Sequence, residues 1–225
     1  MSDIIREVDE EIRRERYMKL WDRYGLYVVA AALIVVIGLS GWRGWEWYSA
    51  RQAAESGARF EAAMQLAAKG DRAGAEAAFN ELASGATSGY RVLARFRAAA
   101  ETARTDPKAG VEAFDAIAAD SSLEDLMRDM ARLHAGYLLV DTASVPELNS
   151  RMEPLLGPTA PFRHSASEVM GLAHYRAGEY ESAAKMFSSL LTDPETPPSL
   201  RQRAQVMNAL VSGATAGAPA APATQ

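Results

Sequence analysis

Residues 171–194 read GLAHYRAGEYESAAKMFSSLLTDP, and this stretch decides the fold. It predicts two helices joined by a turn at Gly178 and Glu179, since glycine marks a turn between helical segments. Gly171 lets the second helix approach the first closely, because glycine has no side chain. Phe187, sixteen residues later, fills the gap between neighbouring pairs of helices. The stretch is therefore predicted to be one helical pair of a repeated array.

The same stretch resembles a tetratricopeptide repeat, in which a small residue and an aromatic residue of the first helix precede a Gly-acid-aromatic turn. In that pattern the second helix carries an alanine and an aromatic residue four positions apart. His174 stands where the pattern favours tyrosine, which predicts a hydrogen-bonded packing histidine. The residues that carry the resemblance are Gly171, Tyr175, Gly178, Glu179, Tyr180, Ala183 and Phe187.

The register of this pair recurs along the chain. A small residue precedes a large one by sixteen positions four times, and the small residues are spaced by 35, 38 and 35. The class of repeat has a period of about 34 residues. We therefore expect four helical pairs. The four matched positions are Ala63 with Phe79, Ala98 with Phe114, Gly136 with Met152, and Gly171 with Phe187.

Turn residues and small residues support this register. Three of the four positions equivalent to Ala183 are small, namely Ala75, Gly110 and Ala183 itself, and the fourth is Leu148. Proline stands at two predicted helix starts, where its missing N–H is harmless. The predicted turns are Gly70-Asp71, Thr105-Asp106-Pro107, Ser144-Val145-Pro146 and Gly178-Glu179. A last helix, 198–212, is expected to cap the array, and the uncharged segment 213–225 is expected to be a disordered tail.

The segment 24–42, YGLYVVAAALIVVIGLSGW, contains no charged residue. As a helix it spans roughly 28 Å, close to the thickness of the hydrocarbon core of a bilayer. All four tryptophans flank it, Trp21 on one side and Trp42, Trp45 and Trp47 on the other. Such aromatic belts are typical of the two membrane interfaces. We therefore expect residues 24–48 to form a transmembrane helix in contact with lipid.

The charges around this segment predict its orientation. Six basic residues precede it, in 1–23, whereas three follow within a comparable distance, which favours a cytoplasmic N-terminus and an exported C-terminal part. The long, acidic leading region argues against a cleaved signal peptide. The cytoplasmic stub 1–23 has a short apolar stripe, which suits an interfacial helix, a docking peptide or a solvated helix equally.

The repeat register also predicts a binding groove on the first helices of the pairs. Apolar rings with a few charges suit a bound peptide or a partner helix, although several of these residues would alternatively pack against the next pair. The arginines at 91, 95, 97 and 104 suit a solvated helix face or, alternatively, a site for an anionic partner. The groove residues are Phe60, Met64, Arg95, Leu133, Tyr137, Glu168, Leu172, Tyr175 and Arg176.

Composition and motifs argue against several classes of function. The chain has 225 residues, a net charge of −5 and no cysteine, and it contains no long basic stripe of the kind that binds nucleic acid. The motifs of serine hydrolases, zinc proteases and phosphate-binding loops are absent from the sequence. His134, His164 and His174 lack the spacing of metal ligands. We expect neither catalysis, nor a cofactor, nor a metal site.

The order of elements, with the anchor LIVVIGLSGWRGWEWYSARQA at 33–53, resembles the ancillary Sec translocon subunit family of bacteria. The resemblance implies a single-pass inner-membrane protein whose repeats face the periplasm. It further implies three kinds of protein partner: the Sec translocon, a membrane-anchored periplasmic chaperone, and exported clients. Members of the family are also linked to envelope stress signalling.

The sequence thus predicts an all-α chain with four parts: a stub at 1–23, an anchor at 24–48, a tetratricopeptide-like α-solenoid at 49–212 and a tail at 213–225. Four helical pairs and a capping helix would make up the solenoid. The predicted function is a membrane-tethered interaction module that helps to pass exported proteins to periplasmic chaperones. The alternatives are a scaffold for cell-envelope assembly or division, and an envelope-stress regulator that acts through the stub.

Overall fold

The computed structural model describes the backbone of residues 2–217 and the side chains of residue 18 and of 21–27, 29–30 and 33–215. The chain divides into two units, residues 1–55 and 56–225. Helix α1 (Ser2–Ala68) runs through the first unit and supplies the first helix of the second unit. The first helix of the first predicted pair is therefore the continuation of the N-terminal helix.

No described helix holds a stretch long and apolar enough to cross a membrane. The side chains of residues 28, 31 and 32 of the predicted anchor, and most side chains of the predicted stub, lie outside the described residues. The membrane anchor stays a prediction.

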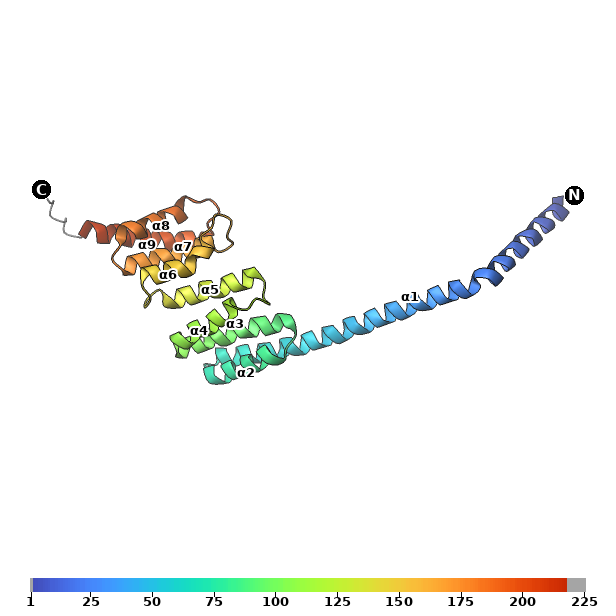
Figure 1. Ribbon diagram of the computed structural model, residues 1–225, viewed down its shortest axis with the longest axis horizontal. Coiled ribbons are helices and arrows are strands. Elements are labelled where there is room, and N and C mark those ends of the chain that lie inside the picture. The colour runs from blue at the N-terminus through green and yellow to red at the C-terminus, as the bar shows by residue number, and fades with distance from the viewer. Residues whose placement is uncertain (1, 218–225) are drawn as a thin grey trace. The chain divides into compact units, whose positions relative to one another are not determined.

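The second unit is an array of antiparallel helices, and no strand occurs among residues 2–217. Each helix packs mainly against its neighbours in sequence, and the first helices of successive pairs also touch, as α5 does α7 and α7 does α9. Figure 1 shows this stack from α2 to α9. The elements are α2 (Arg72–Gly85), α3 (Ser88–Thr105), α4 (Pro107–Ala118), α5 (Asp125–Leu139), α6 (Val145–Met152), the 3₁₀ helix η1 (Glu153–Leu155), α7 (Arg163–Arg176), α8 (Tyr180–Thr192) and α9 (Pro198–Gly217).

The small-to-large register predicted from the sequence is confirmed. A Cβ atom on Gly171 would lie 2.8 Å from Cζ of Phe187, and one on Gly136 would lie 2.6 Å from Cε of Met152. Both distances are shorter than van der Waals contact, so glycine lets Phe187 and Met152 pack directly against the backbone of the first helix. In the other two pairs Ala63 is buried in the same cluster as Phe79, whereas Ala98 is buried in that cluster too and Phe114 lies in the next one. Four helical pairs result.

The predicted turns are also confirmed, and each has a local cause. Gly70 and Gly178 have φ values of +85° and +77°, in the left-handed region that glycine adopts without strain. The two turns without such a glycine end in a side-chain cap: Asp106 accepts hydrogen bonds from the backbone N–H groups that begin α4, and Ser144 does so for α6. Proline follows each of these caps, as expected from the sequence.

Four apolar clusters fill the spaces between successive helices. Each contains the large residue of one pair, and each except the last includes residues of the next pair. The last cluster lies between α8 and α9, where Phe187 and Leu190 contact Ala204 and Val211. The predicted capping helix is thus present and closes the core at the C-terminal end.

Helix α9 ends later than expected. It continues through Gly217, whereas the sequence suggested a disordered segment from residue 213. The hydroxyl groups of Ser212 and Thr215 donate to backbone carbonyls four residues earlier, which satisfies them within the helix. Residues 218–225 of the predicted tail lie outside the described residues.

The packing of Phe187 gives a direct test of this fold. Phe187 is 0% exposed, so Phe187→Ala should lower the free energy of unfolding by roughly 3–5 kcal/mol, the usual cost of deleting a buried aromatic ring. Urea denaturation of the full chain, followed by circular dichroism, measures the change. The control is Leu93→Ala, since Leu93 is half-exposed on α3. Equal stability of the two variants would contradict the register.

Candidate functional site

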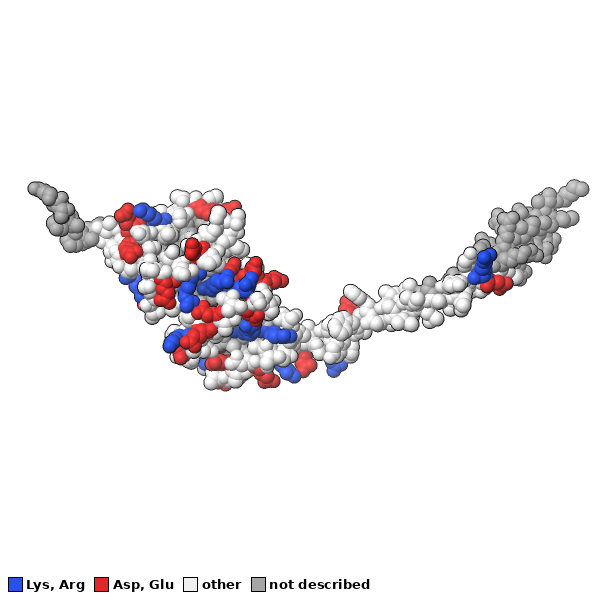
Figure 2. Space-filling view, viewed as in Figure 1, with Lys and Arg blue, Asp and Glu red and all other residues white. Residues whose placement is uncertain are grey.

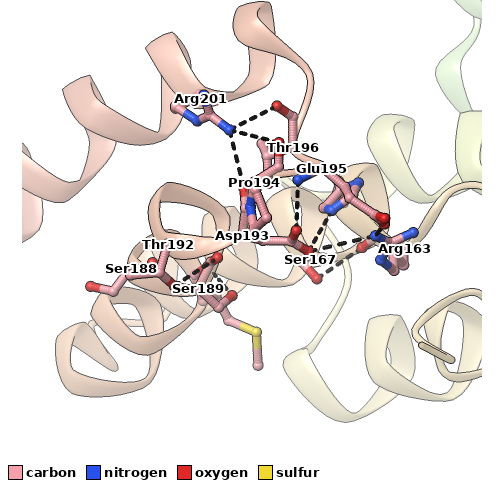
Figure 3. Close-up of polar contacts among 12 residues, drawn as sticks. Arg163, Ser167, Ser188, Ser189, Thr192, Asp193, Pro194, Glu195, Thr196 and Arg201 are labelled. Atoms are coloured by element: carbon pink, nitrogen blue, oxygen red, sulfur yellow. Dashed lines mark hydrogen bonds and ion pairs between the residues drawn. The ribbon is translucent and has the colours of Figure 1, made fainter.

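The loop between α8 and α9 fixes the start of the last helix (Figure 3). The carboxylate of Asp193 accepts a hydrogen bond from the backbone N–H of Glu195 at 2.8 Å and contacts Nε2 of His164 at 2.8 Å. Arg201 donates to three carbonyl oxygens of the same loop, those of Asp193, Pro194 and Thr196, at 3.1–3.3 Å. These bonds hold the N-terminal end of α9 beside α7.

The hydrogen bond with His164 and the backbone N–H of Glu195 lower the pKa of Asp193, because both favour the charged carboxylate. Arg163, at the start of α7, pairs with Asp193 at 3.6 Å and also with Glu195. The loop is therefore an electrostatic link between α7 and α9. It positions α9 as one wall of a pocket.

A pocket of about 540 Å³ lies between α5, α7 and α9. Its walls are largely apolar: Leu172 comes from α7, and Val206 and Met207 come from α9. Tyr137 of α5 is 37% exposed and contributes an aromatic ring. Concave apolar sites with a few placed polar groups are the usual form of binding sites. The full lining is Tyr137, Glu168, Leu172, Gln202, Arg203, Val206 and Met207.

The polar part of the pocket is a three-residue network. Glu168 is 4% exposed, and both of its carboxylate oxygens accept hydrogen bonds. Nε and Nη2 of Arg203 donate to them at 2.6 and 2.8 Å, and the hydroxyl of Tyr137 donates at 2.6 Å. A buried carboxylate is tolerated when it is paired and hydrogen-bonded in this way. The network joins three successive first helices, α5, α7 and α9.

The network also sets the protonation of its members. Burial raises the pKa of Tyr137, and the hydrogen bond to Glu168 raises it further, so the phenol stays protonated. The hydrogen bonds to Glu168 raise the pKa of Arg203, which stays charged. Since the side chain of Arg203 is 55% exposed whereas Glu168 is buried, a molecule entering the pocket meets the cation rather than the carboxylate.

Three of the nine predicted groove residues, Tyr137, Glu168 and Leu172, meet in this pocket. Phe60 and Met64 instead pack against the cluster formed by α2 and α3, with the ring of Phe60 5.3 Å from that of Phe79. Phe60 and Met64 therefore pack against neighbouring helices, which was the alternative to a position in the groove.

The structure places the remaining groove residues elsewhere. Leu133 is buried in the core between α5 and α7. Tyr175 packs beside Tyr180 in the cluster of α8 and α9, with ring centroids 5.7 Å apart. Arg176 donates to the backbone carbonyls of Asp141 and Ala143 and so ties α7 to the preceding pair. Its guanidinium is engaged within the array.

Arg95 lines a second hollow, of about 710 Å³, between α3 and the start of α5. It pairs with Asp120 at 2.5 Å. Hydrogen bonds from Ser122 and then from Arg95 lower the pKa of Asp120 to about 2. The charge of Arg95 is thus neutralised inside the protein. On α5, Arg128 pairs with Asp125 and Arg132 pairs with Asp129, in each case three residues earlier.

Helix α9 contributes four residues to the lining of the pocket that were not predicted from the sequence, namely Gln202, Arg203, Val206 and Met207. From the sequence, this helix is expected only to cap the array. Glu168 is the residue whose position in the sequence could have indicated this site, because a lone acid at a helix position that packs inward requires a cation partner. The choice of Arg203 rather than another arginine depends on how α9 is placed.

The histidines have structural roles. Nδ1 of His174 lies 2.6 Å from Oε2 of Glu179, so the prediction of a hydrogen-bonded packing histidine is confirmed. The ring of His134 stacks on Phe114 with centroids 5.0 Å apart. Among the described side chains, no group of three or more acids or histidines is placed to hold a metal ion. On the face that Figure 2 shows, basic and acidic side chains lie interspersed over the repeats.

A family model described as a tetratricopeptide repeat-like domain matches residues 18–207. The chain belongs to this family of helical-repeat proteins, as the four pairs and their glycine contacts independently indicate. The match begins before the apolar segment 24–42 and so includes it. Searches among curated proteins and among solved structures returned no significant match.

The network of Glu168 and Arg203 can be tested by a double-mutant cycle. Arg203→Leu should lower the free energy of unfolding by about 1–3 kcal/mol, because it leaves a buried carboxylate without its main donor. Glu168→Leu combined with Arg203→Leu should regain much of this loss, since no unpaired charge remains. Urea denaturation of the wild-type chain, the two single variants and the double variant gives the coupling. Additive losses would show that the two residues do not interact.

Proposed function

We propose that the chain is a membrane-tethered module that binds segments of other proteins in the pocket between α5, α7 and α9. The observation that carries this proposal is the apolar pocket wall of Leu172, Val206 and Met207 beside a cation held in place by Glu168. Membership of the tetratricopeptide repeat-like family supports a protein partner, because stacked repeats present extended concave surfaces for binding.

The proposed tether is residues 24–48. Its described apolar side chains, such as the consecutive Val35, Val36 and Ile37, are exposed on different sides of α1 rather than along one stripe. A helix that is apolar all round needs an apolar environment, which a bilayer supplies. The tryptophans at both ends of the segment support a membrane span. The excess of basic residues before it supports a cytoplasmic N-terminus and a periplasmic repeat domain.

We further propose, from the resemblance of 33–53 and the order of the elements, an ancillary role at the Sec translocon of the bacterial inner membrane. In this role the pocket would receive exported proteins or a membrane-anchored periplasmic chaperone. The proposed role is binding rather than catalysis, in keeping with the lack of catalytic motifs in the sequence. A translocating chain exposes apolar segments before it folds, and the apolar wall of the pocket suits such segments.

Protease accessibility tests the proposed topology. Protease added to spheroplasts should degrade residues 50–225 and leave a short membrane-protected N-terminal fragment. A tag at the N-terminus follows the fragment, and a cytoplasmic protein serves as the control for lysis. Survival of the repeat domain in intact spheroplasts would contradict the periplasmic location.

Site-specific crosslinking tests the pocket. A photo-crosslinking residue at Met207 should capture translocon subunits, the chaperone or exported proteins, because Met207 lines the pocket. The matched control is the same residue at Lys185, which is exposed on α8. Gln202→Trp should reduce the adducts from Met207 by filling the pocket from an exposed position. The same adducts from Lys185, or no effect of Gln202→Trp, would move the binding surface away from the pocket.

A further inference from the structure

The pocket between α5, α7 and α9 has no net charge. Two of its seven lining residues are charged, and they neutralise each other: Arg203 donates to both carboxylate oxygens of Glu168, at 2.6 and 2.8 Å. Burial and the hydrogen bond to Glu168 raise the pKa of Tyr137, so this residue adds no charge. A charged group that enters is attracted by one member of the pair and repelled by the other, at similar distances. The lining therefore gives neither an acid nor a base a large electrostatic advantage.

The apolar wall of the pocket, formed by Leu172, Val206 and Met207, disfavours charged ligands further. A charge placed against this wall loses its hydration and gains no partner there, which costs free energy. An apolar side chain instead removes apolar surface from water on both molecules. Methionine adapts its shape to different neighbours, so Met207 suits side chains of different sizes. The wall therefore selects apolar side chains without selecting one particular residue.

Two polar groups at the pocket keep unused hydrogen-bonding capacity. The exposed amide of Gln202 makes no hydrogen bond with a described residue. Glu168 takes the Nε and Nη2 side of the guanidinium of Arg203, and Nη1 has no acceptor among the residues that the structure describes. Gln202 thus offers an acceptor oxygen, and Nη1 offers donors. An uncharged ligand with a donor and an acceptor close together, such as a main-chain amide, satisfies both residues.

Only some polypeptide segments have main-chain amides to offer. Inside a helix each N–H is bonded to the carbonyl four residues earlier, so a docked helix presents side chains alone. An extended segment exposes an N–H and a C=O at every residue, and these groups need partners when the segment leaves water. The free capacity at Gln202 and Arg203 therefore discriminates between the two occupants considered for the predicted groove, a bound peptide and a partner helix. It favours the peptide.

We propose that the pocket binds an uncharged, extended segment of an unfolded polypeptide, whose apolar side chains lie on the wall. A main-chain N–H of the segment donates to the amide oxygen of Gln202, and a main-chain carbonyl accepts from Nη1 of Arg203. The proposal rests on the proposed function and names the class of segment that this site receives. Because every non-proline residue has the same main-chain groups, recognition requires apolarity and an unfolded state rather than a particular sequence. Glu168 keeps Arg203 from acting as a free cation, so acidic motifs gain no preference.

Photo-crosslinking of synthetic peptides to the full chain, held in lipid nanodiscs, tests the absence of a charge preference. The probe is a short peptide of alternating leucine and serine, acetylated and amidated at its ends, with one leucine replaced by photoreactive leucine. Mass spectrometry should place its adducts on the residues that line the pocket. Its half-saturating concentration should change by less than about twofold with salt, because no charge pairs with it, and replacing two serines by glutamate should not lower it. A glutamate peptide that binds several-fold more tightly at low salt would overturn the proposal.

A cycle between protein and peptide tests the main-chain contact. N-methylation of each peptide residue in turn removes one N–H and keeps the side chains. At one position it should raise the half-saturating concentration for the wild-type protein by about three- to tenfold, the effect of one lost hydrogen bond. The effect should fall below about twofold in Gln202→Leu, which already lacks the acceptor, and should persist in Gln205→Leu, a matched change at an exposed position outside the pocket. Equal effects in the two variants would contradict main-chain recognition by Gln202.

The outcomes separate this proposal from the proposed function. Peptide adducts in the pocket that prefer glutamate, or that do not depend on Gln202, overturn the extended-segment proposal and leave the pocket as a binding site. Adducts of exported proteins at Met207 without pocket adducts of the peptide have the same meaning. If neither kind of adduct forms at the pocket, the proposed function fails as well.

Discussion

The contact between a small residue on one helix of a pair and a large side chain on the other is the constraint on which the array depends. At Gly171 and Gly136 a single methyl group would collide with the large residue that lies sixteen positions later. This contact fixes the distance between the two helices of a pair, and the large residue then fills the space before the next pair. Because each pair leaves one apolar face uncovered, the next pair must repeat the arrangement, and the array grows by the same contact.

Polar contacts between the pairs follow the same period. Arg176 reaches carbonyls 33 and 35 residues earlier, Arg151 reaches Asp115 at a separation of 36, and Arg203 reaches Glu168 at a separation of 35. Equivalent positions of neighbouring pairs lie side by side, so an acid in one pair and an arginine one repeat later can meet. These bonds orient the pairs that the apolar contacts hold together, and they engage side chains that would otherwise be open to a partner.

The end of the array is where this pattern leaves surface available. Among residues 2–217, helix α9 packs against α7 and α8. The buried carboxylate of Glu168 holds Arg203 at the edge of the pocket, and Val206 and Leu210 are exposed beside it. The pocket is therefore formed where α9 packs against the first helices of the two preceding pairs.

The repeat could be predicted from the sequence alone. The small residues at 63, 136 and 171 with their large partners, the glycine turns and the prolines at helix starts act through contacts within about twenty residues, and local spacing reveals them. The sequence also predicted the hydrogen bond of His174. Which groups the long side chains contact depends on the tertiary structure alone. Tyr175 and Arg176 are adjacent in the sequence, yet one joins an apolar cluster and the other binds carbonyls of the preceding pair. Arg203 completes the pocket because the α8–α9 loop sets the position of α9. The distance between helices joined through such a loop cannot be predicted from the spacing of residues in the sequence.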